Sequence, residues 1–345
     1  MATVWYAFIL LFLVAYILLD GYDLGAGVIS LFTREREARH AIVEEIGTIW
    51  DGNEVWLVLL GVGFWSGFPL AFGVILPQLY IPIIVILFAL ILRGFSVEMI
   101  SQGGREAKGR WYVAFGIGSL LAAFGQGFAL GALTSPIVIT NGAYSGSTFD
   151  AFSWFSVLTG VTVTLGYVAL GYAFLARRGI GDPKDVSRRG RIVSVLAVVA
   201  AAVSLIAINA TAAPLDLSTS VRAFAFWGLL VFAVVGAVIA IVGFGRAGSA
   251  SAANPYPFAG LAVTVVAVLG AFAVTHYPLL VPPDLTVQAA AAPPSTLWFL
   301  LVAVGLILPV LLFINWFSHS VFSRRVVAPP QQSQERESEG AGHVA

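Results

Sequence analysis

The sequence has no cysteine and few charged residues. Only 10% of its 345 residues are charged, 59% are hydrophobic, and the mean hydropathy is +0.92. Soluble domains carry about 25% charged residues, so this composition predicts an integral membrane protein. The lack of cysteine excludes a disulfide framework, thiolate metal ligands and a cysteine nucleophile.

Ligands for redox metals and nucleotide-binding motifs are also scarce. The four histidines are His40, His276, His319 and His343. In the topology described below, His276 and His319 fall on opposite faces of the membrane, so they cannot hold one haem together. No GxxxxGK[ST], GxGxxG or HExxH motif occurs in a usable context. We therefore expect no catalytic residue, cofactor site or metal site in this chain.

Long apolar runs separated by polar breaks predict an all-α protein with nine transmembrane helices. A bilayer requires about 20 mostly apolar residues per helix. The runs are 4–31, 45–67, 70–98, 111–133, 151–176, 191–212, 222–245, 256–280 and 296–322. The first run has no basic segment before it and no cleavage site, so we expect a retained helix rather than a signal peptide.

The basic residues orient these helices. Lys and Arg collect in cytoplasmic loops. With nine spans, all but two of the 18 Lys and Arg residues follow helices one, three, five, seven and nine, and the exceptions are Arg93 and Arg222. This pattern predicts an outside N-terminus and a cytoplasmic C-terminus. Residues 1–325 would form one transmembrane domain, and the polar residues 326–345 a disordered cytoplasmic tail.

Acidic residues lie in the inner halves of the first three helices. Asp20 and Asp23 occur in "LLDGYDLGAG", and Asp51 and Glu54 in "IWDGNEVWL"; each pair is three residues apart and shares a helix face. Glu98 follows in helix three. A carboxylate near the bilayer centre costs about 2.5–3.5 kcal/mol, so these side chains should face protein or water. Solvation by headgroup water at the helix ends is the alternative.

The pattern is typical of a proton pathway from the cytoplasm, because chains of intramembrane acids recur in proton relays. Arg93 is the expected counter-charge, with Glu98, Asp23 or Asp51 as its partner. Its alternative is to extend toward the inner headgroups. Trp50 belongs either to the interfacial aromatic belt or to a shield around the proton site.

The segments "DGYDLGAG", "IWDGNEVWL" and "LRGFSVE", with "YPLLVPPDLTVQ" late in the chain, resemble subunit II of cytochrome bd-type quinol oxidases. The resemblance implies nine helices in two four-helix bundles plus one peripheral helix. It implies a heterodimer with subunit I, which would hold haem b, haem d and the quinol site, and reduction of O2 to water with protons from the cytoplasm.

In this resemblance, Asp51 and Glu98 match the proton path, and Asp20 and Asp23 match paired aspartates of helix one. Met99 and Ile100 depart from the aromatic residue and arginine that often follow the acid. Further implied partners are a structural quinone, a small single-helix subunit and the lipid bilayer of a prokaryotic plasma membrane, but no nucleic acid. The alternatives are a proton-coupled secondary transporter, which usually shows inverted repeats not found here, and a purely structural scaffold.

Overall fold

The computed structural model describes residues 1–102, 105–134, 137, 139–140, 143–211, 215–246, 254–282 and 285–321. The predicted tail, residues 326–345, lies outside them. The helices are α1 (Ala2–Phe32), α2 (Arg36–Gly47), α3 (Trp50–Gly67), α4 (Pro69–Gln78), α5 (Tyr80–Gln102), α6 (Arg105–Ala132), α7 (Trp154–Arg178), α8 (Pro183–Ala207), the 3-10 helix Ile208–Ala210, α9 (Ser220–Arg246), α10 (Tyr256–His276), α11 (Val287–Ala290) and α12 (Pro294–Val321). Two short antiparallel hairpins pair β1 (Ile139–Thr140) with β2 (Ala143–Tyr144) and β3 (Leu279–Val281) with β4 (Leu285–Thr286). The predicted helical class is confirmed.

Eight helices of the described chain are long and apolar enough to cross a membrane: α1, α5, α6, α7, α8, α9, α10 and α12. Helices α3 and α4 are long and apolar enough to cross a membrane only when they are taken together, and the pair is bent by 120° at Phe68. If this pair is one span, the total is nine. The predicted third run, 70–98, is wrong in its extent, because Leu79 divides it between α4 and α5. Pro69 begins α4, where its missing N–H has no intrahelical partner to lose.

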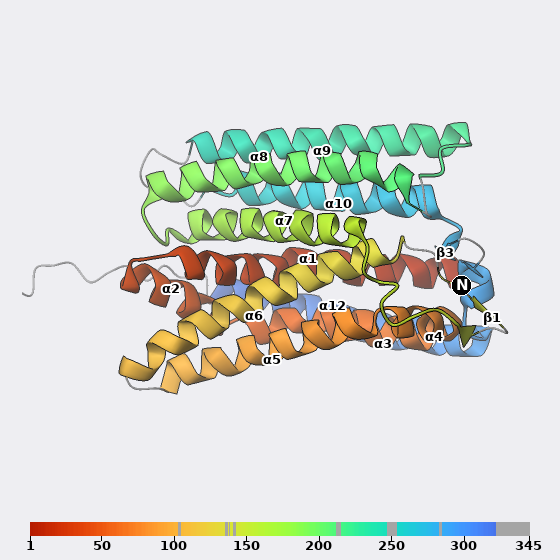
Figure 1. Cartoon of the computed structure of the whole chain (residues 1–345), viewed down its shortest axis with the longest axis horizontal. Helices are drawn as coiled ribbons and strands as arrows, with labels where there is room; N and C mark the ends of the chain where they lie inside the picture. The colour runs from red at the N-terminus through yellow and green to blue at the C-terminus, as the bar shows by residue number, and fades with distance from the viewer. Residues whose placement is uncertain are drawn as a thin grey trace, which may run out of the picture.

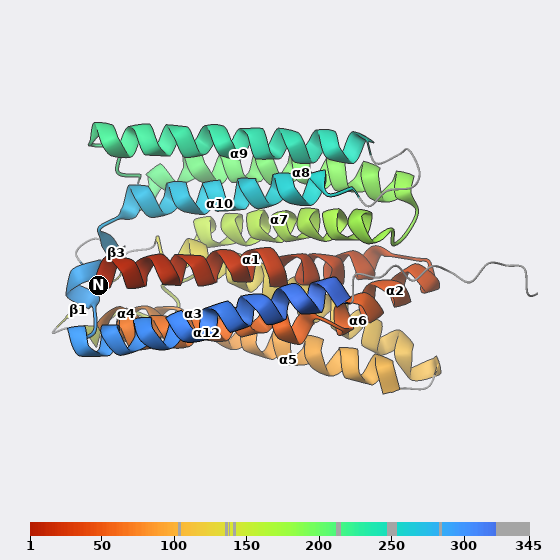
Figure 2. The same cartoon turned by 180° about the vertical axis from the view of Figure 1, so that it is seen from behind.

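Helix α1 runs through the middle of the molecule (Figures 1 and 2). Helices α7, α8, α9 and α10 lie on one side of it, and α3, α4, α5 and α12 lie on the other. The N-terminus and both hairpins are at one end. At the opposite end lie α2, the end of α5, the start of α6 and the α7–α8 turn. These segments carry most of the Arg and Lys residues, and we call this end the basic end.

Helices α1 and α7 approach so closely that glycine is required at their crossing. A Cβ added to Gly25 would lie 1.7 Å from the backbone oxygen of Tyr167, and one added to Gly171 would lie 2.5 Å from the backbone nitrogen of Ala26. Such distances are not compatible with any side chain. The small-residue step at Gly21 and Gly25 therefore serves packing within the chain.

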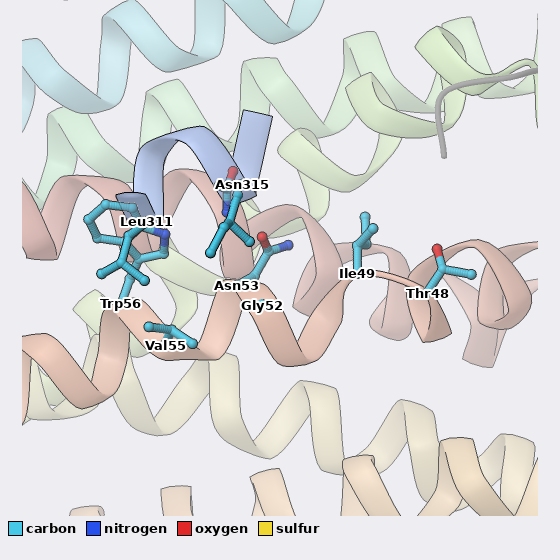
Figure 3. A pocket seen from close by; sticks show the side chains of 9 residues that line it. Thr48, Ile49, Gly52, Asn53, Val55, Trp56, Leu311 and Asn315 are labelled. Carbon is cyan, nitrogen blue, oxygen red and sulfur yellow. The ribbon is translucent and has the colours of Figure 1, made fainter. Parts of the chain in front are cut away.

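Near the basic end, the first turn of α3 lies against the last turns of α12, as Figure 3 shows. The side chains of Asn53 and Asn315 lie between these two helices (Figure 3). The chain breaks between α2 and α3 at Thr48 and Ile49. The first turn of α3 then lies beside residues 19–23 of α1, to which Asn53 is hydrogen-bonded.

Candidate functional site, a buried acid–arginine cluster

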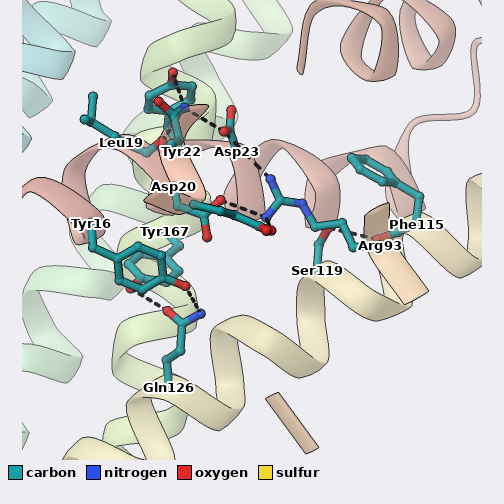
Figure 4. A network of polar contacts seen from close by, with 12 residues as sticks. Tyr16, Leu19, Asp20, Tyr22, Asp23, Arg93, Phe115, Ser119, Gln126 and Tyr167 are labelled. Atoms are coloured by element: carbon teal, nitrogen blue, oxygen red, sulfur yellow. Dashed lines mark hydrogen bonds and ion pairs between the residues drawn. The ribbon is translucent and has the colours of Figure 1, made fainter. Parts of the chain in front are cut away.

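The structure brings one arginine and three carboxylates together inside the helix bundle (Figure 4). Arg93 Nη1 lies 2.7 Å from Asp20 Oδ1 and 3.4 Å from Glu54 Oε1, and Arg93 Nη2 lies 3.7 Å from Asp23 Oδ2. The side chains of Arg93, Asp20 and Asp23 are fully buried, whereas that of Glu54 is 23% exposed. We call Asp20, Asp23, Glu54 and Arg93 the acid–arginine cluster.

Helix geometry explains how these residues meet. Asp20 and Asp23 are one turn apart on α1, so both can face the same guanidinium of Arg93. Arg93 reaches them from α5 and Glu54 from α3. A buried charge needs a partner because lipid and protein solvate it poorly, and the guanidinium fork can serve several carboxylates at once.

The cluster leaves both acceptors and donors without hydrogen bonds, since Arg93 Nε and Nη2 are also buried and have no hydrogen-bond partner among the described residues. Asp20 Oδ2 and Asp23 Oδ1 are buried and have no hydrogen-bond partner within the described part of the chain. Three carboxylates against one arginine also leave the charges unbalanced. A proton bound to one of these carboxylate oxygens would reduce the net charge and supply a hydrogen-bond donor.

Asn53 contacts the acid–arginine cluster, although its sequence position did not lead us to predict this. Its Nδ2 donates to Asp23 Oδ2 at 2.8 Å, to Tyr22 Oη at 2.9 Å and to the Leu19 carbonyl at 3.2 Å. The residue is only 1% exposed. The signal was present, since an amide in the apolar motif "WDGNEVW" costs free energy unless it is hydrogen-bonded.

A second polar chain begins at Tyr16, one turn closer to the N-terminus of α1 than Asp20. Gln126 Nε2 donates to Tyr16 Oη at 2.6 Å, and Tyr167 Oη donates to Gln126 Oε1 at 2.9 Å (Figure 4). It connects α1, α6 and α7 beside Asp20. Gln126 was also missed, although it is a lone amide in the apolar stretch "AAFGQGFAL".

The two acids expected to lead the proton path lie outside the cluster. Asp51 and Glu98 are exposed, and neither forms an ion pair with another described residue. Glu98 accepts a hydrogen bond from Gln102. Of the partners predicted for Arg93, Asp23 is therefore correct and Glu98 and Asp51 are wrong. The alternative that Arg93 extends toward headgroups is also wrong, because its side chain is 0% exposed.

Trp50 lies beside the cluster rather than only at a membrane interface. The Cζ atom of Arg93 is 5.8 Å from the centroid of the Trp50 ring, which is within the range of a cation–π contact. A Cβ added to Gly94 would lie 2.8 Å from this indole, so the neighbouring glycine makes room for it. Trp50 thus closes one side of the arginine.

At the basic end, a further ion pair connects α2 to α7. Arg178 Nε lies 2.9 Å from Glu45 Oε1, and both side chains are mostly covered. Burial raises the pKa of Glu45 above its usual value, while Arg178 partly opposes this effect. The pair holds α2 against the bundle near the start of α3.

Among the described residues, no group of three or more His, Asp or Glu side chains is arranged to hold a metal ion. His40 Nδ1 lies 2.9 Å from Tyr112 Oη, and His276 Nδ1 lies 2.9 Å from the Phe272 carbonyl oxygen. These two histidines thus have local partners near the two ends of the molecule.

Known proteins share this sequence pattern. A family model described as cytochrome bd terminal oxidase subunit II matches residues 1–322. The chain is 30% identical over 192 residues to the cytochrome bd ubiquinol oxidase subunit 2 of Bacillus subtilis, a match covering 54% of this chain and 56% of that protein. It is 25% identical over 187 residues to the cytochrome bd-I ubiquinol oxidase subunit 2 of Escherichia coli (strain K12), covering 52% and 49%. The chain thus spans about half the length of the curated relatives it matches.

One solved structure shares the fold over nearly the whole chain. A chain of the bd oxidase from Geobacillus thermodenitrificans matches with a TM-score of 0.76 at 19% identity, covering 93% of this chain and 98% of that one. At this identity the match establishes the fold alone. Because the family model covers almost the full length, the chain belongs to the cytochrome bd terminal oxidase subunit II family.

Proposed function

We propose that this chain is the haem-free subunit II of a cytochrome bd-type quinol:O2 oxidoreductase. It pairs with a subunit I that holds haem b and haem d, and the complex reduces O2 to water with electrons from quinol. The isolated chain is not the catalyst; its own role is to support subunit I and to line a proton pathway. The observation that carries this role is the buried acid–arginine cluster, since such groups are costly in a membrane without a function.

The membrane arrangement follows from the same proposal. The bent pair α3–α4 serves as the ninth span, and the helices form two four-helix bundles with one peripheral helix. The complex lies in the plasma membrane of a prokaryote, with the basic end in the cytoplasm and the N-terminus outside, because Lys and Arg favour the cytoplasmic face. Residues 1–325 are one transmembrane domain and 326–345 a cytoplasmic tail. A structural quinone and a small single-helix subunit belong to the proposed complex.

Protons enter at the basic end. Asp51 on α3 and Glu98 on α5 are exposed there and act as the first acceptors. Glu54 follows, because it is partly exposed and lies within 3.4 Å of Arg93. Asp20 and Asp23 are the innermost acids of the pathway. Their oxygens without a hydrogen-bond partner can accept a proton, and Arg93 offsets part of the negative charge. Trp50 covers the arginine.

A structural scaffold is the alternative that one observation favours. The cluster connects α1, α3 and α5, and its fully buried ion pairs would hold these helices together without conducting anything. Family membership argues against the secondary transporter considered earlier. Turnover of the complex separates a proton relay from a scaffold.

The test replaces Asp51 in the complete complex. We expect Asp51→Asn to lower quinol-driven oxygen consumption by about tenfold, equivalent to about 1.4 kcal/mol in the limiting barrier, because an amide cannot pass on a proton. Haem content, measured from the optical spectrum, should stay unchanged. Asp185→Asn is the control, since Asp185 is an exposed acid at the basic end that pairs with Arg189 outside the cluster. Normal turnover in both Asp51→Asn and Glu98→Gln would refute the relay.

A further inference from the structure

A pocket separates the start of α3 from the end of α12. Its volume is about 130 Å³, and its polar lining consists of Thr48, Asn53 and Asn315 (Figure 3). The remaining walls are apolar or glycine: Ile49, Gly52, Val55, Trp56, Leu311 and Ile314. One water needs only about 10–15 Å³ of such space, so the pocket has room for several.

The lining favours water over lipid as the occupant. The Thr48 hydroxyl donates to the Glu45 carbonyl and Asn53 Nδ2 has three acceptors in the chain, so the Asn315 amide is the lining group that an occupant would serve. A polar group in a membrane is costly unless it is hydrogen-bonded. Acyl chains cannot supply such bonds, whereas water can. The pocket also borders the surface of the molecule, because its lining residues Gly52 and Val55 are exposed.

Asn53 connects the pocket to the acid–arginine cluster. It lines the pocket and donates to Asp23 Oδ2 at 2.8 Å. The other oxygen of this carboxylate, Oδ1, is buried without a hydrogen-bond partner in the described chain, and Arg93 Nη2 lies 3.7 Å from Oδ2. The side-chain amide of Asn53 therefore lies between the pocket and Asp23.

We propose that this pocket is a water-binding site and that Asn53 is a positioning residue that holds Asp23 toward it. The pocket would carry protons onward to Asp23, in series with the exposed acids Asp51 and Glu98 at the basic end. The proton transfer rests on the proposed function, whereas the presence of water in the pocket can be tested by itself.

Access to the pocket can be measured because the chain has no cysteine of its own. We expect Asn315→Cys, in the whole complex in sealed vesicles, to react with a charged methanethiosulfonate reagent added on the basic-end side. Leu312→Cys is the matched control, since Leu312 is one turn away on α12 but is 52% exposed on the outer surface and does not line the pocket. It should react several-fold more slowly, because a thiol in lipid does not ionise. Mass analysis of this chain reports the modification.

A pair of glycine substitutions tests the route. A Cβ at Gly52 or at Gly61 meets no atom within 4 Å, so a side chain fits at either position of α3. Gly52 lines the pocket and Gly61 does not. We expect Gly52→Leu to lower both the labelling of Asn315→Cys and the turnover several-fold, and Gly61→Leu to change neither.

Two results would overturn the proposal. One is a lack of labelling at Asn315→Cys, and the other is unchanged turnover in Gly52→Leu despite blocked labelling. In either case the proposed function stands if Asp51→Asn still lowers turnover. Failure of the water-pocket proposal can therefore be distinguished from failure of the proposed function.

Discussion

Arg93 is the residue on which the cluster depends, because it is the one cation within reach of three acids among the described residues. Its guanidinium stays charged at every relevant pH and presents several donors in a plane, so it can contact carboxylates from two helices. Removing it would leave Asp20 and Asp23 buried without a cation. Removing one partner of a buried ion pair costs about 3–5 kcal/mol.

We therefore expect Arg93→Met to destabilise the complex by about 3–5 kcal/mol, which appears as a lower midpoint of thermal unfolding and as haem loss. Arg189→Met is the control, because Arg189 pairs with Asp185 at 2.8 Å while both side chains are more than a third exposed. Exposed pairs contribute only about 0–1 kcal/mol. Equal losses in the two variants would show that burial of the cluster has no special role.

At the scale of elements, helix contacts decide which side chains meet. Helix α7 lies against α1 and α6, and glycines permit this at several points. Gly171 is the clearest case, since an added Cβ would lie 2.5–3.1 Å from backbone atoms of Gly25 and Ala26, which cannot rotate away. Backbone contacts of this kind fix the rotation of α1, and with it the direction of Asp20 and Asp23.

Replacing Gly171 should separate the two helices. We expect Gly171→Leu to destabilise the protein by about 3 kcal/mol or more, the upper range for an overpacked core, and to reduce assembly of the complex. Gly166→Leu is the matched control on the same helix, because a Cβ at Gly166 meets no atom within 4 Å. The measurements are thermal midpoint and yield of assembled complex. If both variants assemble normally, the crossing is looser than the structure indicates.

The breaks between elements were harder to predict than the elements. The break before Pro69 falls between the predicted runs 45–67 and 70–98. The division at Leu79 was not predicted, because apolar residues continue through it. Helix α2 was missed for a related reason. It is short and amphipathic, and it packs Ile42, Val43 and Ile46 against the bundle instead of crossing a membrane.

At the scale of the whole molecule, the ends differ in charge. The basic end carries most Lys and Arg residues, and the N-terminus lies at the other end. Single cysteines can report the orientation: we expect Ser101→Cys, at the end of α5, to be modified by an impermeant thiol reagent from the cytoplasmic side. Thr140→Cys, on β1, should be modified from outside. Both positions are exposed, and labelling of both from one side would contradict the proposed topology.

The sequence by itself determined the membrane class, most of the spans and the gathering of basic residues at one end. Hydropathy and charge act locally, because bilayer thickness sets helix length and membrane charge sets loop composition. It also placed Asp20 and Asp23 on one face, which helix periodicity alone requires. Only the tertiary structure decided the partners of Arg93. Asp51 and Glu54 differ by about 60° around the axis of α3, and that small angle leaves one exposed and turns the other toward Arg93. Which of the two faces inward depends on how α3 packs against α1 and α12, and those contacts come from residues far apart in the chain.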